Sequence, residues 1–301
     1  MRITESIIKR NSMLSIHENM SQLYDTSQRL STGKKILKPS DSPSNIKALS
    51  DYKLKYSMNE QYKKNINFSL SRLSLVESSI SSIYDELSRL REKLLQYKSS
   101  TSNEIKNNMV EEIELSIKNV ASYLNKREGD SYIFSGTKIF SKSFDFEVGS
   151  DPDGQIRIQN VIYNGNFLKP EVKISDSDFE ICGFNGEEIS NIKGNNIFSI
   201  LIDLRKKVLN GDNISSNIDQ INSYLNSLDD LSVNIGFKIS NLNSRIESIE
   251  KENLRISGFI SNIEDIDYSV ELTKYTSLQN KYNIAIKIYT NLTQKNISDY
   301  I

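Results

Sequence analysis

The sequence has very few of the residues on which most enzymatic sites depend. Its 301 residues include one cysteine, Cys182, one histidine, His17, and no tryptophan. A single cysteine excludes a disulfide framework within the chain, and one histidine beside it excludes a Cys/His metal cluster. We therefore expect no enzyme, no cofactor and no metal site. Cys182 is expected to be a buried small hydrophobic residue, and His17 to lie on the polar face of a helix.

An excess of charge of one sign and long apolar runs are also missing. The chain has 38 Lys and Arg against 39 Asp and Glu, which gives a formal net charge of -1. Because nucleic-acid-binding proteins carry a basic surplus or stripe, this balance argues against a nucleic-acid partner. The most apolar stretch, 196–202, is far shorter than the roughly 20 residues of a membrane-spanning helix. With no cleavable secretory signal before Lys9, we expect no membrane insertion, and either a cytosolic location or export by another route.

Proline and glycine, which interrupt helices, are scarce and unevenly placed. The prolines are at 39, 43, 152 and 170, and eight of the twelve glycines lie between Gly129 and Gly194. A turn-rich middle therefore separates two arms that are poor in helix breakers. We predict a mainly α protein: a long antiparallel helical bundle or coiled coil formed by the N- and C-terminal arms, with a small antiparallel β domain inserted in the middle.

Heptad spacing of apolar residues predicts that the helices of the arms pack on other helices. One series recurs every seven residues, and a second alternates steps of four and three, with Asn253 as its polar member. The two series are Ile66, Leu73, Ile80, Leu87, Leu94, and Ile235, Ile239, Leu242, Ile246, Ile249, Asn253, Ile256, Ile260, Ile263. Further helices are expected over 102–127 and 197–209 and from Ser215 onward, with a joint near Asp267.

The middle of the chain alternates apolar and polar residues with the period of a β-strand. Four such runs, 144–148, 156–158, 172–174 and 179–181, are separated by turn signals at 151–154, Asn164-Gly165 and Asn185-Gly186. Asn-Gly between such runs favours a hairpin, and we expect a spacer or surface domain. The predicted domains are terminal helices over 1–33 and 268–301, a helical rod over 42–130 and 196–267, and the β insertion over 131–195.

The first and last helices have apolar seams but no partner that is adjacent in sequence. Alanine, the best helix former, occurs only at 48, 121 and 285, so these helices must gain stability from packing. We expect the two ends to pair with one another and with neighbouring molecules. The predicted subunit interface consists of Ile3, Ile7, Leu14, Met20, Leu23, Leu30, Tyr275, Leu278, Tyr282, Ala285, Tyr289 and Leu292.

Several motifs at both ends of the chain point to a known family. They are Met1–Thr4, Gln28–Asp41, Asn59–Tyr62, Arg72–Glu77, Ser131–Lys138, Ile263–Tyr268 and Ser298–Ile301. Together they resemble the flagellar hook-associated protein 3 family, within the flagellin superfamily. Residues 140–195 carry no resemblance beyond general β character, and the alanine content is far below the family habit.

This resemblance implies a structural subunit of the bacterial flagellum. Members of the family form the junction ring that adapts hook to filament, and they are exported unfolded by the flagellar type III apparatus. The implied partners are other copies of the chain, the first hook-associated protein on the hook side, flagellin on the filament side, and an export chaperone at the C-terminal segment. The implied location is the hook–filament junction outside the cell, or the periplasm where flagella are internal.

Three alternatives remain open from the residues. Flagellin itself, the bulk filament subunit, shares the helical arms, although the linker 34–43 and the end 299–301 fit the junction protein better. A cytosolic coiled-coil adaptor would use the β insertion as its binding head. A hydrolase would have to use the scattered carboxylates Asp176, Asp178 and Glu180, which fit a solvated strand edge better.

Overall fold

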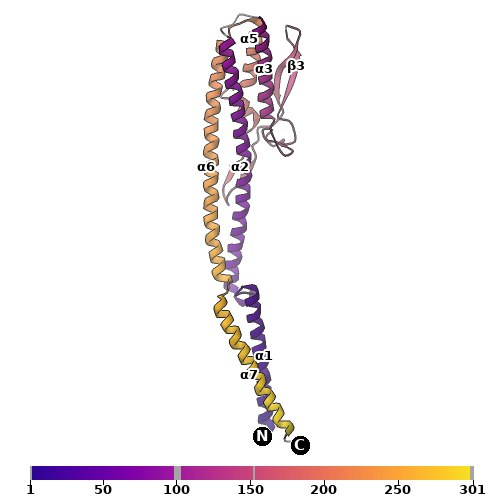
Figure 1. Ribbon diagram of the computed structural model, residues 1–301, viewed down its shortest axis with the longest axis vertical. Helices are drawn as coiled ribbons and strands as arrows, with labels where there is room; N and C mark the ends of the chain where they lie inside the picture. The colour runs from indigo at the N-terminus through magenta and orange to yellow at the C-terminus, as the bar shows by residue number, and fades with distance from the viewer. Residues whose placement is uncertain (1, 98–102, 152, 299–301) are drawn as a thin grey trace. The chain divides into compact units, whose positions relative to one another are not determined.

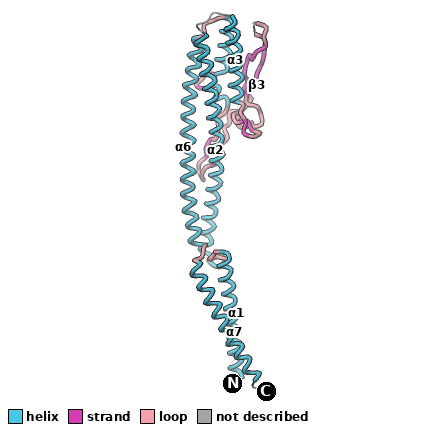
Figure 2. Tube along the Cα trace, in the orientation of Figure 1, coloured by secondary structure: helices cyan, strands magenta, loops and turns pink. Residues whose placement is uncertain are grey.

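Helices dominate the protein, as the sequence predicts (Figures 1 and 2). The computed structural model describes residues 2–97, 103–151 and 153–298, with the backbone alone for 2–5, 103 and 292–298. The helices are α1 (Arg2–Thr32), α2 (Pro43–Tyr97), α3 (Asn103–Leu124), α4 (Gly186–Ser190), α5 (Ile197–Asn210), α6 (Ser215–Glu264) and α7 (Tyr268–Ser298), and a 3₁₀ turn spans Pro39–Asp41. The predicted joint near Asp267 is confirmed, because α6 ends at Glu264 and α7 begins at Tyr268.

The strands of the described residues form antiparallel pairs rather than one sheet. The pairs are β1 (Arg127–Glu128) with β2 (Ser131–Tyr132), β3 (Phe144–Ser150) with β4 (Ile156–Tyr163), β5 (Glu171–Lys173) with β6 (Phe179–Ile181), and β7 (Asn191–Ile192) with β8 (Asn195–Asn196). Asp153 and Gly154 lie in the turn of the β3–β4 hairpin, and the register of the hairpin shifts between Glu147 and Val148. Each of the four alternating runs in the sequence thus contributes to a strand.

The hairpin expected at Asn185-Gly186 is wrong, because this dipeptide begins a short helix. The Asn185 side chain accepts a hydrogen bond of 2.8 Å from the backbone N–H of Glu188 and so caps the N-terminus of α4. Asn is favoured at helix N-caps as well as in hairpin turns, and local sequence does not separate the two uses. The aromatic ring of Phe144 lies against Gly186, where a Cβ atom would be 2.5 Å from it.

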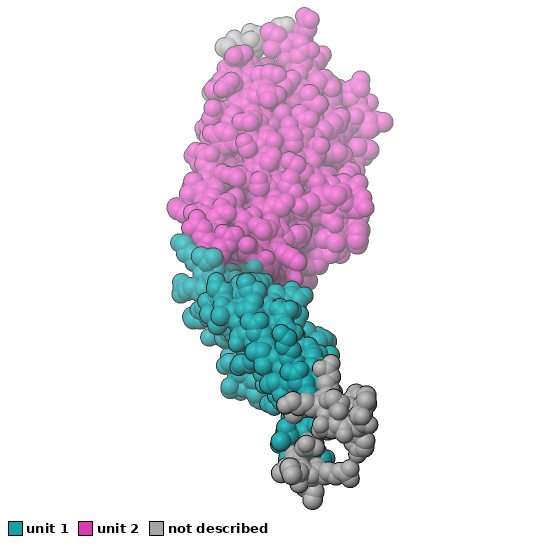
Figure 3. Space-filling view, turned by 60° about the horizontal axis from the view of Figure 1, so that its bottom comes forward, with its two compact units in different colours: residues 1–58, 251–301 teal, residues 59–250 magenta. Residues whose placement is uncertain are grey.

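The chain divides into two compact units, which Figure 3 colours separately. Unit 1 contains residues 1–58 and 251–301, and unit 2 contains residues 59–250. The strands therefore do not form a unit of their own, and unit 1 extends further along the chain than the terminal helices alone. Contacts between the start of α2 and the end of α6 account for this extent. Tyr52 stacks on Phe259 with ring centroids 5.3 Å apart, and Lys55 pairs with Glu252 at 2.6 Å.

The core of unit 2 is built on the predicted heptad positions. All five aliphatic residues of the seven-residue series in α2 are buried, and so is the apolar stripe of α3. On α6, Ile235, Leu242 and Ile249 are buried, which confirms the 4-3 series. Burial of such stripes supplies the stability that the intrinsic helix propensities of Ser, Asn and Ile do not.

A buried ionic network fixes the β3–β4 hairpin to the helices of unit 2. Arg205 of α5 has no exposed side-chain surface, and it pairs with Glu114 of α3 and with Asp151, which follows β3. Arg157 of β4 pairs with Asp151 at 3.3 Å. Glu114 also accepts a hydrogen bond from the backbone N–H of Ile158 at 3.1 Å. Because buried charges are costly unless paired, this network fixes how the hairpin lies on α3 and α5. No pattern in the sequence pointed to it.

Candidate assembly surface

The first and last helices pack against each other within unit 1. On α1, Thr26 is buried and Leu23 and Leu30 are half-buried, and on α7 Leu278 is buried. Arg29 of α1 lies 3.8 Å from Glu271 of α7. Tyr275, Tyr282, Ala285 and Tyr289 are half-buried on the same stripe of α7 as Leu278. These seven apolar positions of the predicted interface, from Leu23 to Tyr289, therefore lie where the two ends of one chain meet.

The other predicted interface residues that the structure describes point away from this pair. Ile7, Leu14 and Met20 of α1 are 52%, 58% and 55% exposed. The side chains of Ile3 and Leu292 lie outside the described residues. The predicted set therefore separates into residues that join α1 to α7 and residues that are exposed in the single chain.

More apolar residues are exposed on these helices than the heptad stripes indicated. They are Ile8, Met13 and Tyr24 on α1, and Val270, Leu272, Ile284 and Ile288 on α7. A search for one stripe per helix misses them, because they lie beside the stripe and not on it. Exposed apolar residues that gather into a large patch are common on surfaces that bind other molecules.

A polar joint connects α1 to the end of α6. The Lys34 ammonium lies 3.1 Å from Asp265 and 3.3 Å from Glu264, and Lys53 of α2 lies 3.0 Å from Glu264. The backbone N–H of Ile266 donates a hydrogen bond of 3.0 Å to the carbonyl of Gly33. The joint thus contains both ion pairs and backbone hydrogen bonds.

These contacts shift the pKa values of the charged groups in the joint. Hydrogen bonds from Ser261 and then from Lys34 lower the pKa of Asp265 below its usual 3.8. Desolvation alone would raise the pKa of Glu264, but hydrogen bonds from Lys53 and Lys34 outweigh it and the pKa falls below 4.5. The hydrogen bond to Asp265 raises the pKa of Lys34.

The Lys-Pro-Ser-Asp linker motif folds around one carboxylate. Asp41 accepts hydrogen bonds from the backbone N–H groups of Lys38 at 2.9 Å and Leu37 at 3.0 Å. These two bonds lower the pKa of Asp41. Pro39 begins the 3₁₀ turn, and Pro43 is the first residue of α2, a position where its missing N–H has no cost. The motif is therefore a compact turn that ends one helix and begins the next.

Acid is expected to weaken unit 1. Asp41, Glu264 and Asp265 have lower pKa values in the folded chain than in the unfolded chain, where these values are 3.8 to 4.5. The three carboxylates therefore stabilise the fold at a pH above this range. This stabilisation is lost as the pH falls through the pKa values of the folded chain. Lys34 has a raised pKa, so its contribution is complete below 10.5 and is lost only above that pH. Thermal unfolding followed by circular dichroism should show a loss of stability below about pH 4. Asp265→Asn should make the thermal stability depend less on pH in this range. If the pH dependence is unchanged in this variant, the Asp265 carboxylate does not cause the acid sensitivity.

Gly33, which ends α1, is expected to be intolerant of a side chain. Its φ is +72°, and a Cβ atom there would be 2.9 Å from the Tyr268 hydroxyl. Gly33→Ala should destabilise unit 1 by about 1–2 kcal/mol, the cost of the left-handed conformation. Gly258→Ala is the matched control, because Gly258 lies within α6 with open space around it. It should stabilise the helix by about 0.5–1 kcal/mol, as measured by urea unfolding; equal effects at both positions would disprove the explanation.

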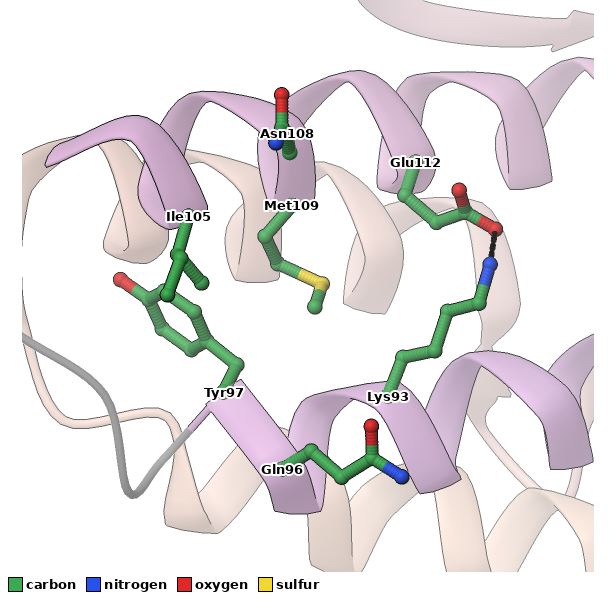
Figure 4. A pocket seen from close by; sticks show the side chains of 7 residues that line it. All are labelled: Lys93, Gln96, Tyr97, Ile105, Asn108, Met109 and Glu112. Carbon is green, nitrogen blue, oxygen red and sulfur yellow. Dashed lines mark hydrogen bonds and ion pairs between the residues drawn. The ribbon is translucent and has the colours of Figure 1, made fainter. Parts of the chain in front are cut away.

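A cavity of about 400 Å³ lies between the end of α2 and the start of α3 (Figure 4). It is lined by Lys93, Gln96, Tyr97, Ile105, Asn108, Met109 and Glu112. The ammonium of Lys93 is paired with the Glu112 carboxylate. Among the described residues, no group of three or more His, Cys, Asp or Glu could hold a metal ion.

The carboxylates that a hydrolase would need serve instead to attach the β5–β6 hairpin. Asp176 accepts a hydrogen bond of 2.8 Å from the Tyr62 hydroxyl of α2. Glu180 pairs with Lys238 of α6 at 2.6 Å, and Asp178 lies 3.9 Å from Arg245 of α6. The three carboxylates thus connect the hairpin to α2 and α6 and do not converge on one point.

The single cysteine, the single histidine and the apolar length of the helices were also the subject of predictions. Cys182 is fully buried, as predicted, and burial raises the pKa of its thiol. His17 is exposed on α1. Over the described part of the chain, no helix is long and apolar enough to span a bilayer.

Comparison with protein families gives matches at both ends of the chain. Residues 3–145 match the family described as bacterial flagellin N-terminal helical region, and residues 218–301 match bacterial flagellin C-terminal helical region. Among curated proteins, flagellar hook-associated protein 3 of Salmonella typhimurium is 22% identical over 193 residues. The match covers 64% of this chain and 57% of that relative.

Solved structures share the fold. A putative flagellar hook-associated protein from Vibrio parahaemolyticus superimposes with a TM-score of 0.63 at 18% identity, over 75% of this chain and 100% of that one. The flagellar junction protein FlgL from Legionella pneumophila gives a TM-score of 0.53 at 14% identity, over 72% and 100% of the two chains.

Proposed function

The chain belongs to the flagellin superfamily, and from that premise we propose that it is a structural subunit of the bacterial flagellum that forms the junction between hook and filament. Its partners in this proposal are further copies of itself, the first hook-associated protein below and flagellin above. It reaches the junction unfolded through the flagellar type III apparatus, with an export chaperone on its C-terminal segment. It performs no catalysis.

One observation carries the proposal: the two family-matching ends of the chain meet as the α1–α7 pair and leave apolar residues exposed. Leu14 and Ile284 are both more than half exposed, on different helices of this pair. In a free subunit such surface costs solvation free energy, and burial between subunits recovers it. A subunit of a polymer needs apolar surface that becomes buried against other subunits, whereas a monomeric adaptor does not need such surface.

Flagellin remains the second candidate, because both matching family regions carry its name. The similarity to hook-associated protein 3 of Salmonella supports the junction assignment instead. The two candidates differ in copy number, since a filament subunit is present in vast excess over a junction ring.

Deletion of the gene tests the proposal. Cells without the protein should build hooks, carry no filaments and shed flagellin into the medium, and a plasmid copy should restore filaments. Quantitative mass spectrometry of purified flagella should find the chain at a small fraction of the flagellin level. Normal filaments in the deletion strain would disprove the junction role, and a level equal to that of the main filament protein would establish flagellin instead.

A further inference from the structure

Three asparagines of the chain are each followed by glycine, in the pairs Asn164-Gly165, Asn185-Gly186 and Asn210-Gly211. Asparagine is a thermolabile residue, and in this dipeptide the backbone nitrogen of the glycine can attack Cγ, the carbonyl carbon of the asparagine side chain. Glycine favours the attack, because it has no Cβ atom and reaches many backbone conformations. A hydrogen bond from the glycine N–H opposes the attack, because this bond has to break before the nitrogen can react.

Two of the three pairs are protected by such a hydrogen bond. The N–H of Gly186 donates a hydrogen bond of 2.8 Å to the carbonyl of Phe134, and Asn185, the N-cap of α4, is only 2% exposed. The N–H of Gly211, at the C-terminus of α5, donates to the carbonyl of Val208 at 3.2 Å. In the folded chain both of these attacking nitrogens are therefore held away from reaction.

The pair Asn164-Gly165, which follows β4, lacks this protection. Over the described residues, no hydrogen bond engages the N–H of Gly165. Asn164 is exposed, so water and hydroxide reach its amide. The side chain is restrained by a hydrogen bond of 2.7 Å from its Nδ2 to the carboxylate of Asp145. The pair combines an unengaged attacking nitrogen with an amide that solvent can reach.

The fold nevertheless requires glycine at position 165. A Cβ atom on Gly165 would lie 2.3 Å from the hydroxyl of Tyr163. That hydroxyl donates hydrogen bonds of 3.0 Å to the carbonyls of Phe134 and Asn166, so the ring cannot move aside without losing them. The packing around Tyr163 thus keeps the labile dipeptide in the sequence.

We propose that Asn164 is a site of spontaneous deamidation in the folded protein. The nitrogen of Gly165 loses its proton to hydroxide and forms a bond to Cγ of Asn164. The Cγ–Nδ2 bond then breaks, and Nδ2 takes up a proton from water and leaves as ammonia. Water opens the resulting five-membered succinimide at either carbonyl and gives aspartate or isoaspartate. One water is consumed and one ammonia released, with no oxidation or reduction, and the reaction does not depend on the junction role.

Both products disturb the place where β4 ends beside the start of β3. The amide that donated to Asp145 becomes a carboxylate, so an attraction is replaced by repulsion between like charges. Isoaspartate also lengthens the backbone by one methylene group. Phe144, next to Asp145, is 1% exposed and packs on the rings of Tyr163 and Phe198 at 5.2 and 5.3 Å. Deamidation should therefore loosen the contact of the β3–β4 hairpin with the core of unit 2.

Peptide mapping by mass spectrometry, after incubation of the full chain in mildly alkaline buffer, tests the proposal. In the folded chain Asn164 should deamidate about fivefold faster than Asn185 and Asn210, or more, which is the factor that one hydrogen bond contributes. In guanidinium chloride the three asparagines should react at similar rates, because the protecting hydrogen bonds are lost. If Asn164 stays intact in the folded chain for as long as Asn185 and Asn210, the proposal is overturned.

Two variants examine the chemistry at this position. Asp145→Ala removes the restraint on the amide and should bring the rate at Asn164 closer to its rate in guanidinium chloride. Asn164→Gln should give no product there, because its longer side chain would have to close a six-membered ring. An unchanged rate in the alanine variant, or equal deamidation of the glutamine variant, would contradict the mechanism.

The structural effect of the product is tested by building it into the chain. Asn164→Asp should lower the midpoint of thermal unfolding and speed hydrogen exchange in β3 and β4. Adding Asp145→Asn exchanges the donor and the acceptor and should restore the midpoint. An unchanged midpoint in the single variant, or no recovery in the double variant, would show that the contact with Asp145 does not carry the effect.

Discussion

Replacing Arg205 with methionine should lower the free energy of unfolding of unit 2 by about 3–5 kcal/mol. The side chain is fully buried, and its removal leaves the carboxylates of Glu114 and Asp151 without their shared cation. Arg157 still pairs with Asp151 at 3.3 Å, and the largely exposed Lys118 lies 3.8 Å from Glu114, so these two cations compensate only in part. Methionine fills most of the space, so the loss reports the uncompensated charge and not a cavity.

Urea unfolding and hydrogen exchange in β4 measure this loss. The double variant Arg205→Met with Glu114→Leu is the control, since replacing both members of a buried ion pair with apolar residues is far less costly than removing one. It should recover more than half of the lost stability. If the double variant is as unstable as the two single losses added together, the network contributes no coupling and the explanation is wrong.

Replacing Leu14 with aspartate should abolish filament growth while the isolated chain stays folded. Leu14 is 58% exposed in the single chain, so the substitution should change its stability by less than about 0.5 kcal/mol. In an assembled contact the same carboxylate would be buried without a partner, at a cost of several kcal/mol. We expect more than about a tenfold loss of filaments per cell, because each 1.4 kcal/mol is a factor of ten in association.

Two measurements show whether the loss of filaments comes from failed assembly and not from failed export. Immunoblots of the medium should find the Leu14→Asp chain exported at the normal level, and Leu14→Met, which keeps an apolar side chain of similar volume, should support normal filaments. Normal filaments in the aspartate variant would show that this face of α1 is not an assembly surface.

Sequence periodicity predicted the helices well because their stripes are long and repeat many times. The series from Ile66 to Leu94 extends over four heptads, and its members are all buried. A single two-residue signal carries less information, which is why Asn185-Gly186 was assigned to a hairpin when it caps α4. Tertiary context decided between the two uses.

The sequence predicts the assembly surface only in part. Heptad spacing groups residues on one stripe per helix, and it assigned Tyr275 and Leu14 to the same interface. The structure separates them, because Tyr275 lies on the stripe that joins α7 to α1 and Leu14 points outward. The buried Arg205 network could not be predicted, since its members lie 37 or more residues apart in sequence except for Asp151 and Arg157.

The joint formed by Lys34, Glu264 and Asp265 has a mechanical consequence. The ion pairs of this joint are partly exposed to solvent, so bending of the chain at this point can break and re-form them. Their strength depends on dissolved ions, because screening shortens the reach of exposed charges from about 30 Å at 0.01 M to about 3 Å at 1 M. The compliance of the subunit should therefore rise from fresh water to brine.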